Sequence, residues 1–366
     1  MNMEGPEPAA SSHSDNKLSN GHSSKLSPVL QRTLTVTSCL LLALGDTGGP
    51  LISRLYFHGG GRRQWLSCFL ETAGFPLLLL PLLLSYLRRR RADPRAAPVL
   101  MIRPPVFLAC AVLGLLTGAD DYLYAYGLSF LPVSTSALLL STHLAFTAGF
   151  AFLLVKQRFT PYSVNSVVLL SVGALLLGLH GSSDRPPGVS KHQYLLGLFL
   201  TVAAAALYGL VLVLVELTYA RARQKVTYTL VIEMQVVIAF FATMFCLVGM
   251  ILNKDFQAIP KEAMQYELGR TKYYVVLVWN AILWQCFFLG AVGVIFCVNT
   301  LLTAIINAAL IPVTGILGVF LFQEKFSSEK GVALALSLWG LASYIYGEYL
   351  TMLEKRRASH TSVLTT

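Results

Sequence analysis

Long apolar segments recur along nearly the whole chain, and short polar segments separate them. Each is close to the roughly 20 residues that a helix needs to cross a hydrocarbon core about 30 Å thick. Lipid offers unpaired backbone groups no partner, and no segment alternates like a barrel strand, so all are predicted to be helices. The pattern predicts an all-α integral membrane protein with ten transmembrane helices, at residues 33–56, 64–87, 105–127, 132–155, 162–180, 192–217, 228–252, 273–297, 299–322 and 329–352.

A weak internal repeat divides these segments into two sets of five. Shifting the chain by 167 residues aligns Arg158-Phe159-Thr160 with Lys325-Phe326-Ser327, and Gly173 with Gly340. Five crossings per half would insert the second half upside down, a construction typical of secondary transporters. The alternative is chance similarity between apolar helices. We therefore expect two inverted five-helix repeats, at residues 32–181 and 182–352.

Composition agrees with a membrane protein and predicts its orientation. Hydrophobic residues make up 55% of the chain and charged residues 13%, against about a quarter charged in soluble proteins. The net charge of +10 does not indicate a nucleic acid partner, because most basic residues lie beside the apolar segments, where they set topology. The four arginines at 88–91 favour cytosolic termini.

Both ends of the chain are expected to be cytosolic tails. Residues 1–31 are rich in Ser, Asn, His and Pro and lack the apolar core of a signal peptide, which predicts disorder, and residues 353–366 follow the last apolar segment. The six cysteines all lie inside predicted helices, without metal-ligand or paired spacing. They are interpreted as packing residues, and no metal, cofactor or enzymatic activity is expected.

Acidic side chains inside the apolar segments are the first candidates for function. An ionisable group in hydrocarbon costs from about 2.5 to more than 10 kcal/mol, so each should face a cavity or a partner. Asp120 and Asp121 share a helix flank with Thr117 and Tyr124. Two adjacent carboxyl groups let one be protonated while the other is ionised, which suits proton coupling. Alternatively, they bond helix ends or an arginine. The further acids inside the apolar segments are Asp46, Glu71 and Glu233, with Glu216, Glu324 and Glu348 nearer the segment ends.

Aromatic and amide side chains at mid-membrane indicate a binding site. Trp284 and Gln285 lie in the middle of a segment, away from the interfacial belts where Trp is common. A flat ring beside an amide suits a planar heterocycle, although core packing is an alternative. His143 and Asn307 are further candidates for contacts to its edge.

Several motifs resemble the plant purine permeases, a family within the drug/metabolite transporter superfamily. The resemblance runs from about residue 33 to 350. It is carried by Leu42-Ala43-Leu44-Gly45-Asp46-Thr47-Gly48-Gly49-Pro50, Phe69-Leu70-Glu71-Thr72-Ala73-Gly74-Phe75-Pro76, Asp120-Asp121-Tyr122-Leu123-Tyr124-Ala125-Tyr126-Gly127, Lys156-Gln157-Arg158-Phe159-Thr160-Pro161 and Tyr346-Gly347-Glu348.

This resemblance implies a ten-helix importer in the plasma membrane that couples protons to the uptake of adenine-like bases and cytokinins. Relatives that move caffeine, alkaloids or pyridoxine make those heterocycles the alternative substrates. Glu71, Asp120, Asp121, Tyr124, Trp284 and Gln285 fall on motifs that resemble those of the family. With the candidates found from membrane depth, we expect substrate binding by Tyr124, His143, Trp284, Gln285, Asn307 and Asp121, and proton coupling by Glu71, Asp120, Asp121 and Asp46. Three positions depart from the expected pattern, because Asp46, His143 and Gly315 stand where relatives have Asn, Gln and Glu.

Two other classes of protein remain as alternatives. An intramembrane aspartyl protease needs two acids that share a water and a proton, and Asp46 with Asp121 superficially offers them. Such a protease would leave the internal repeat unexplained. A membrane receptor that binds cytokinin without moving it would fit the same pocket, and only a flux measurement separates it from a transporter.

Overall fold

The computed structural model of the protein describes residues 28–92, 101–155, 160–180, 185–186, 188–222, 227–297 and 300–364. Within these ranges the chain forms helices and no strands. Each predicted apolar segment coincides with one helix or with two consecutive helices. The helices are α1 (Pro28–His58), α2 (Gln64–Thr72), α3 (Pro76–Ala92), α4 (Pro104–Phe130), α5 (Val133–Leu140), α6 (His143–Val155), α7 (Pro161–His180), α8 (Lys191–Arg221), α9 (Tyr228–Leu252), α10 (Asp255–Gln265), α11 (Arg270–Cys297), α12 (Thr300–Phe322) and α13 (Ser328–Leu364).

Seven stretches in the described part of the chain are long and apolar enough to cross a membrane. They are Gln31–His58, Gln64–Leu87, Pro104–Phe130, Val133–Leu154, Lys191–Arg221, Thr229–Leu252 and Arg270–Val294. Shorter apolar helices cover Pro161–Leu176 and Ile306–Phe322. The protein is therefore an all-helical integral membrane protein. Helix α10 was not predicted, because its sequence is polar and shorter than a membrane crossing.

Two helices extend into the predicted terminal tails. Helix α1 begins at Pro28, inside the predicted N-terminal tail, and residues 1–27 lie outside the described part. Helix α13 continues to Leu364, through most of the predicted C-terminal tail. Its final turns hold several strong helix formers and neither Gly nor Pro after Gly347, so no local signal ends the helix. Arg158 and Phe159 of the repeat motif also lie outside the described residues.

Two of the predicted crossings are interrupted beside the cavity that is described below. The segment at 64–87 divides into α2 and α3 around Gly74, and Pro76 opens the second helix, where its missing N–H is tolerated. The segment at 132–155 divides at Ser141 and Thr142 into α5 and α6. Interrupted helices at membrane depth are typical of transporter binding sites.

Helix α1 is continuous, although it contains three glycines and Pro50, residues that can interrupt a helix. A Cβ on Gly45 would collide with the backbone of Phe287 in α11, and one on Gly290 would collide with the backbone of Leu42. A Cβ on Gly293 would likewise collide with Ser38. The glycines therefore let α1 and α11 approach to backbone contact.

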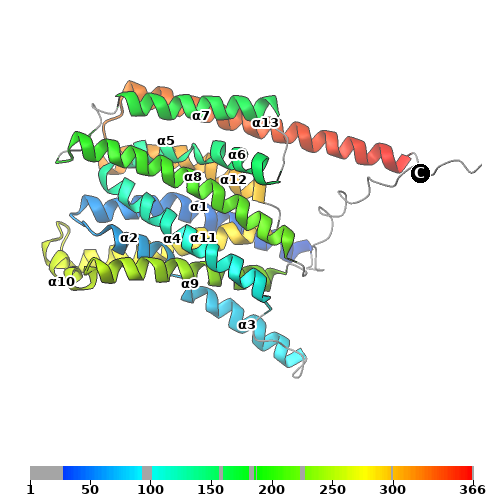
Figure 1. Ribbon diagram of the computed structural model, residues 1–366, viewed down its shortest axis with the longest axis horizontal. Coiled ribbons are helices and arrows are strands. Elements are labelled where there is room, and N and C mark those ends of the chain that lie inside the picture. Colours follow the sequence, from blue (N-terminus) through cyan, green and yellow to red (C-terminus); the bar gives the residue numbers. More distant parts are fainter. Residues whose placement is uncertain are drawn as a thin grey trace, which may run out of the picture.

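The bundle is built from helix pairs that each join the first half of the sequence to the second. Helix α1 packs on α11, α4 on α8, α5 on α12, α2 on α9, and α7 on α13. Figure 1 shows α7 and α13 side by side along one face of the bundle, with the end of α13 reaching beyond it. Helix α3 diverges from the opposite face, and α10 lies at one end of the bundle (Figure 1).

A network of polar side chains holds α10 at that end. The Tyr56 hydroxyl donates to Glu262 Oε1 at 2.6 Å, and the Tyr273 hydroxyl donates to the same oxygen at 3.2 Å. The Arg63 guanidinium lies 3.3 Å from Asp255 Oδ1 and 3.8 Å from Glu262 Oε2. This cluster of five side chains, the α10 cluster, ties α1, α10 and α11 together.

Candidate functional site

A cavity of about 170 Å³ lies between the two halves of the sequence. Its walls come from α1, α2, α4, α5, α6, α8, α9, α11 and α12, so both halves contribute. The lining includes most residues predicted from the sequence: Asp46, Glu71, Thr117, Asp120, Asp121, Tyr124, His143, Trp284 and Asn307. Residues from Asp46 in the first half to Asn307 in the second are thus brought into one space, as expected for a site formed by helix packing.

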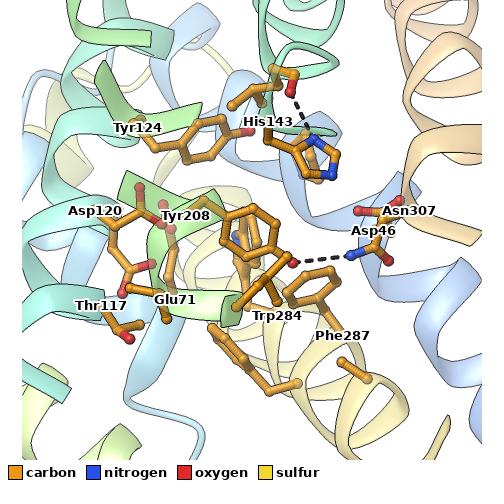
Figure 2. Close-up of a pocket in the computed structure, with 18 of the residues that line it drawn as sticks. Asp46, Glu71, Thr117, Asp120, Tyr124, His143, Tyr208, Trp284, Phe287 and Asn307 are labelled. Atoms are coloured by element: carbon orange, nitrogen blue, oxygen red, sulfur yellow. Dashed lines mark hydrogen bonds between the residues drawn. The ribbon is translucent and has the colours of Figure 1, made fainter. Parts of the chain in front are cut away.

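One side of the cavity carries three acids. Glu71, at the end of α2, faces Asp120 and Asp121 of α4, and all three are at most 8% exposed. In Figure 2 the carboxyl groups of Glu71 and Asp120 lie close together, beside Thr117. Each of the three acids has a buried oxygen without a hydrogen-bond partner, and so does the Thr117 hydroxyl. The alternative in which these acids bond helix ends or an arginine finds no support in the described bonds.

The other side of the cavity carries mostly acceptors. Asn307 Nδ2 donates to the Tyr208 hydroxyl at 3.0 Å, which leaves Asn307 Oδ1 unpaired. His143 Nδ1 lies 2.8 Å from the Leu140 carbonyl, which leaves Nε2 as the unpaired nitrogen of a neutral ring. Asp46 Oδ2 is also unpaired. Figure 2 places Asp46, Asn307 and His143 across the aromatic rings from Asp120 and Glu71.

Aromatic rings form the wall between these two sides. Trp284 meets the ring of Tyr124 edge to face, with centroids 5.7 Å apart, and meets Phe287 in the same manner. The ring centroids of Tyr208 and His143 are 5.4 Å apart, and these rings also meet edge to face. Neither lysine nor arginine is found among the described residues that line the cavity. The site therefore combines flat apolar faces with unpaired acceptors at both edges.

Gln285 is the one predicted binding residue that lies elsewhere. It is buried, but it does not line the cavity. A Cβ on Gly74 would come within 3.0 Å of Gln285 Oε1, so the amide packs against the turn between α2 and α3. Gln285 is rotated by about 100° from Trp284 around the axis of α11, and this rotation turns its side chain out of the cavity lining.

Comparison with known proteins agrees with this geometry. Residues 33–354 match the family model PUNUT, described as purine nucleobase transmembrane transport. The chain belongs to this family of purine nucleobase transporters. It is 48% identical to Purine permease 3 of Arabidopsis thaliana over 328 residues, covering 89% of this chain and 93% of that one. Purine permease 2 of the same plant is also 48% identical, over 91% and 97% of the two chains.

A solved crystal structure shares the fold of the transporter. It covers 87% of this chain and 98% of its own, with a TM-score of 0.52 and 17% sequence identity. At this identity the likeness concerns the fold alone.

Two acids that were candidates from the sequence have structural partners in the transporter. The Glu233 carboxylate accepts hydrogen bonds from the backbone N–H groups of Met101 at 2.7 Å and Ile102 at 3.1 Å, just before α4. The Glu324 carboxylate accepts from the backbone of Val133 at 2.7 Å and from Ser134, at the start of α5. Both satisfy donors at a helix entry and lie outside the cavity lining.

Sequence reasoning missed Tyr208 and Thr314, which line the cavity of the transporter. Tyr208 lies in an apolar helix rich in Ala, Leu and Val, where one tyrosine gives no pattern. The Thr314 hydroxyl lies 3.5 Å from the Asp46 carbonyl oxygen. This contact joins α12 to α1 and is seen only in the folded structure. Gly315 faces α5 at ordinary contact distance and does not line the cavity.

Proposed function

We propose that this protein is a proton-coupled importer of purine bases and zeatin-type cytokinins, with adenine as the simplest substrate. The observation that carries the proposal is the cavity itself, in which unpaired carboxyl oxygens stand at the edges of an aromatic wall. The names of its relatives support purine transport. The transport of cytokinins and the coupling to protons are further parts of the proposal.

Recognition of the substrate would use the two chemistries of the cavity. A flat base stacks on Trp284 and against the ring of Tyr124. Its N–H groups donate to acceptors that lack partners, such as His143 Nε2 and Asn307 Oδ1. Because its described lining holds several acceptors and neither lysine nor arginine, the cavity favours a heterocycle rich in N–H donors over an anionic one.

Proton coupling would use the acids of the first side. Asp120 and Asp121 are adjacent, and Glu71 lies with them in the same water-poor space, so the three carboxyl groups cannot all ionise without strong repulsion. Proton uptake by one of them would accompany substrate binding, and its loss would accompany release. Asp46, across the cavity, is a further proton-coupling candidate.

Alternation between outward and inward access would use two inverted repeats of five crossings. The shift of 167 residues carries Val133 and Val155, the outer bounds of α5 and α6, onto Thr300 and Phe322, the bounds of α12. It also carries α1 onto α8 and α4 onto α11, so the packed pair of α1 and α11 becomes the packed pair of α8 and α4. This exchange supports repeats that rock around a central site.

We further propose that both termini are cytosolic and that the protein resides in the plasma membrane, where an external proton gradient drives import. The arginines at 88–91 support this orientation. Helix α10, between the crossings of α9 and α11, then lies on the outer face.

The test is uptake of radiolabelled adenine and trans-zeatin by yeast that lacks its own purine permease, at acidic and neutral external pH, with and without a protonophore. We expect uptake that is stronger at acidic pH and is abolished by the protonophore. Uptake indifferent to both would reject proton coupling. Binding without uptake would indicate a receptor, and uptake of alkaloids or pyridoxine alone would reject the purine and cytokinin substrates.

A further inference from the structure

The polar edge of the Trp284 ring bonds to a side chain outside the cavity lining and is fixed by buried groups. Its indole N–H donates to the Ser53 hydroxyl of α1 at 3.1 Å. Ser53 is fully buried, and it does not line the cavity. The indole N–H is therefore already satisfied by the protein, so the ring offers a substrate its face and not a hydrogen bond.

The Ser53 hydroxyl is in turn held by Asn280. Ser53 Oγ donates to Asn280 Oδ1 at 2.9 Å, and Asn280 is also fully buried and outside the cavity lining. A serine hydroxyl has one hydrogen and two lone pairs. Because Asn280 takes the hydrogen, the lone pairs remain for the indole N–H.

Helical spacing places residues that contact or hold the indole ring on both α1 and α11. Asn280 and Trp284 are four residues apart on α11, so they stack on one face of that helix. Gly49 and Ser53 are likewise four apart on α1. A Cβ on Gly49 would come within 3.1 Å of the two atoms at the fused bond of the indole, so this glycine lies against one face of the ring.

We propose that Ser53 and Asn280 are positioning residues, which set the angle of the Trp284 ring and thereby the affinity for the planar substrate. Gly49 supports one face of the ring, Ser53 fixes its N–H edge, and the cavity side remains for stacking. This inference rests on the proposed function, because it concerns the same site. It assigns roles to two residues that never touch the substrate.

The test compares Ser53→Ala with Ser38→Ala in the adenine uptake assay, with the amount of protein at the surface measured for each. Both serines are buried in α1 and face α11, but only Ser53 holds the indole. Loss of one hydrogen bond predicts a KM for adenine raised about fivefold to tenfold in Ser53→Ala, with little change in maximal rate. Ser38→Ala and the conservative Ser53→Thr should stay near wild type.

A double-mutant cycle separates positioning from simple packing of α1 on α11. Trp284→Phe removes the indole N–H, so adding Ser53→Ala to it should raise KM no further. If Ser53→Ala raises KM by the same factor in both backgrounds, or leaves it unchanged in the wild type, the positioning role is rejected. Absence of adenine uptake by the wild-type protein at the surface would instead reject the proposed function itself.

Discussion

The α10 cluster and the cavity both bury carboxyl groups, but they treat them in opposite ways. In the α10 cluster Glu262 accepts from Tyr56 and Tyr273, and Asp255 is held by Arg63. Asp255 of the α10 cluster leaves only its Oδ2 unpaired, whereas no described hydrogen bond or ion pair reaches the carboxyl groups of Glu71, Asp120 and Asp121 in the cavity. Buried polar groups normally find partners within the protein. The difference shows that the first set is held by bonds within the protein, and it supports the proposal that the second set meets a ligand or a proton.

Glu233 and Glu324 extend the comparison, because both resemble the cavity acids in sequence yet behave like the α10 cluster. Each accepts two or more hydrogen bonds from backbone N–H groups at a helix entry. Burial of an acid in a membrane protein is therefore a weak sign of function by itself. A buried acid without a partner is a stronger one.

The largest effect is expected from the close packing of α1 on α11, two helices that form part of the cavity wall. Gly45→Ala puts a methyl group into the backbone of Phe287, so α1 and α11 must separate. We expect a loss of stability of about 3 kcal/mol and little uptake. The control is Gly149→Ala, because a Cβ on Gly149 meets nothing within 4 Å. Thermal unfolding in detergent measures both, and equal melting temperatures would contradict the close packing of α1 on α11.

Neutralising a cavity acid should remove function and spare the fold. Asp120→Asn or Asp121→Asn is expected to lower adenine uptake at acidic pH by at least about 30-fold, because the proton carrier or a substrate contact is lost. Since these oxygens have no partners to lose, the melting temperature should stay within a few degrees of wild type. The comparison fails if either variant unfolds readily while its uptake per folded molecule is normal.

The reverse result is expected in the α10 cluster. Glu262→Gln removes the charge that two tyrosine hydroxyls and Arg63 face, at a cost of about 2 kcal/mol. The melting temperature should fall by a few degrees, while the KM for adenine stays within about twofold of wild type. Measuring both values on one purified preparation tests the division of roles. A strongly raised KM at an unchanged melting temperature would place Glu262 with the functional acids.

The smallest effect is a pH dependence of stability at Asp255. Burial raises the pKa of this carboxyl above its ordinary value, although Arg63 opposes the shift. The folded state then binds a proton that the unfolded state has released, so this group's contribution to stability declines as pH rises above about 3.9, through the folded pKa. Asp255→Asn should therefore cost most at acidic pH and less towards neutrality. Melting temperatures at several pH values check the sign, and a cost that grows with pH would contradict it.

The sequence predicted the helices and most of the cavity because both depend on strong local signals. Apolar length is enough to locate the helices, and an acid such as Asp46 or Glu71 inside such a segment is conspicuous whatever its partners are. Membrane depth and the family resemblance together predicted one site from Asp46, Glu71, Asp120, Asp121, Trp284 and His143, and all six line the cavity.

The rest depended on contacts between helices, which the sequence does not encode locally. Nothing near Glu233 or Glu324 says that backbone donors over a hundred residues away will face them. Gln285 was misplaced because its rotation about α11 is set by packing against Gly74. In the sequence nothing distinguishes Ser53 and Asn280 from other polar residues. Only the folded structure shows the hydrogen bonds that link them to Trp284.

The central claim is that unpaired acids of the cavity carry protons together with the substrate. The most direct test is a proton flux measurement with the purified protein in liposomes that contain a pH-sensitive dye. In the wild type, adenine added outside should acidify the lumen, and in Asp120→Asn and Asp121→Asn this acidification should be lost while the protein remains folded. Entry of adenine into wild-type liposomes without any acidification would contradict the account.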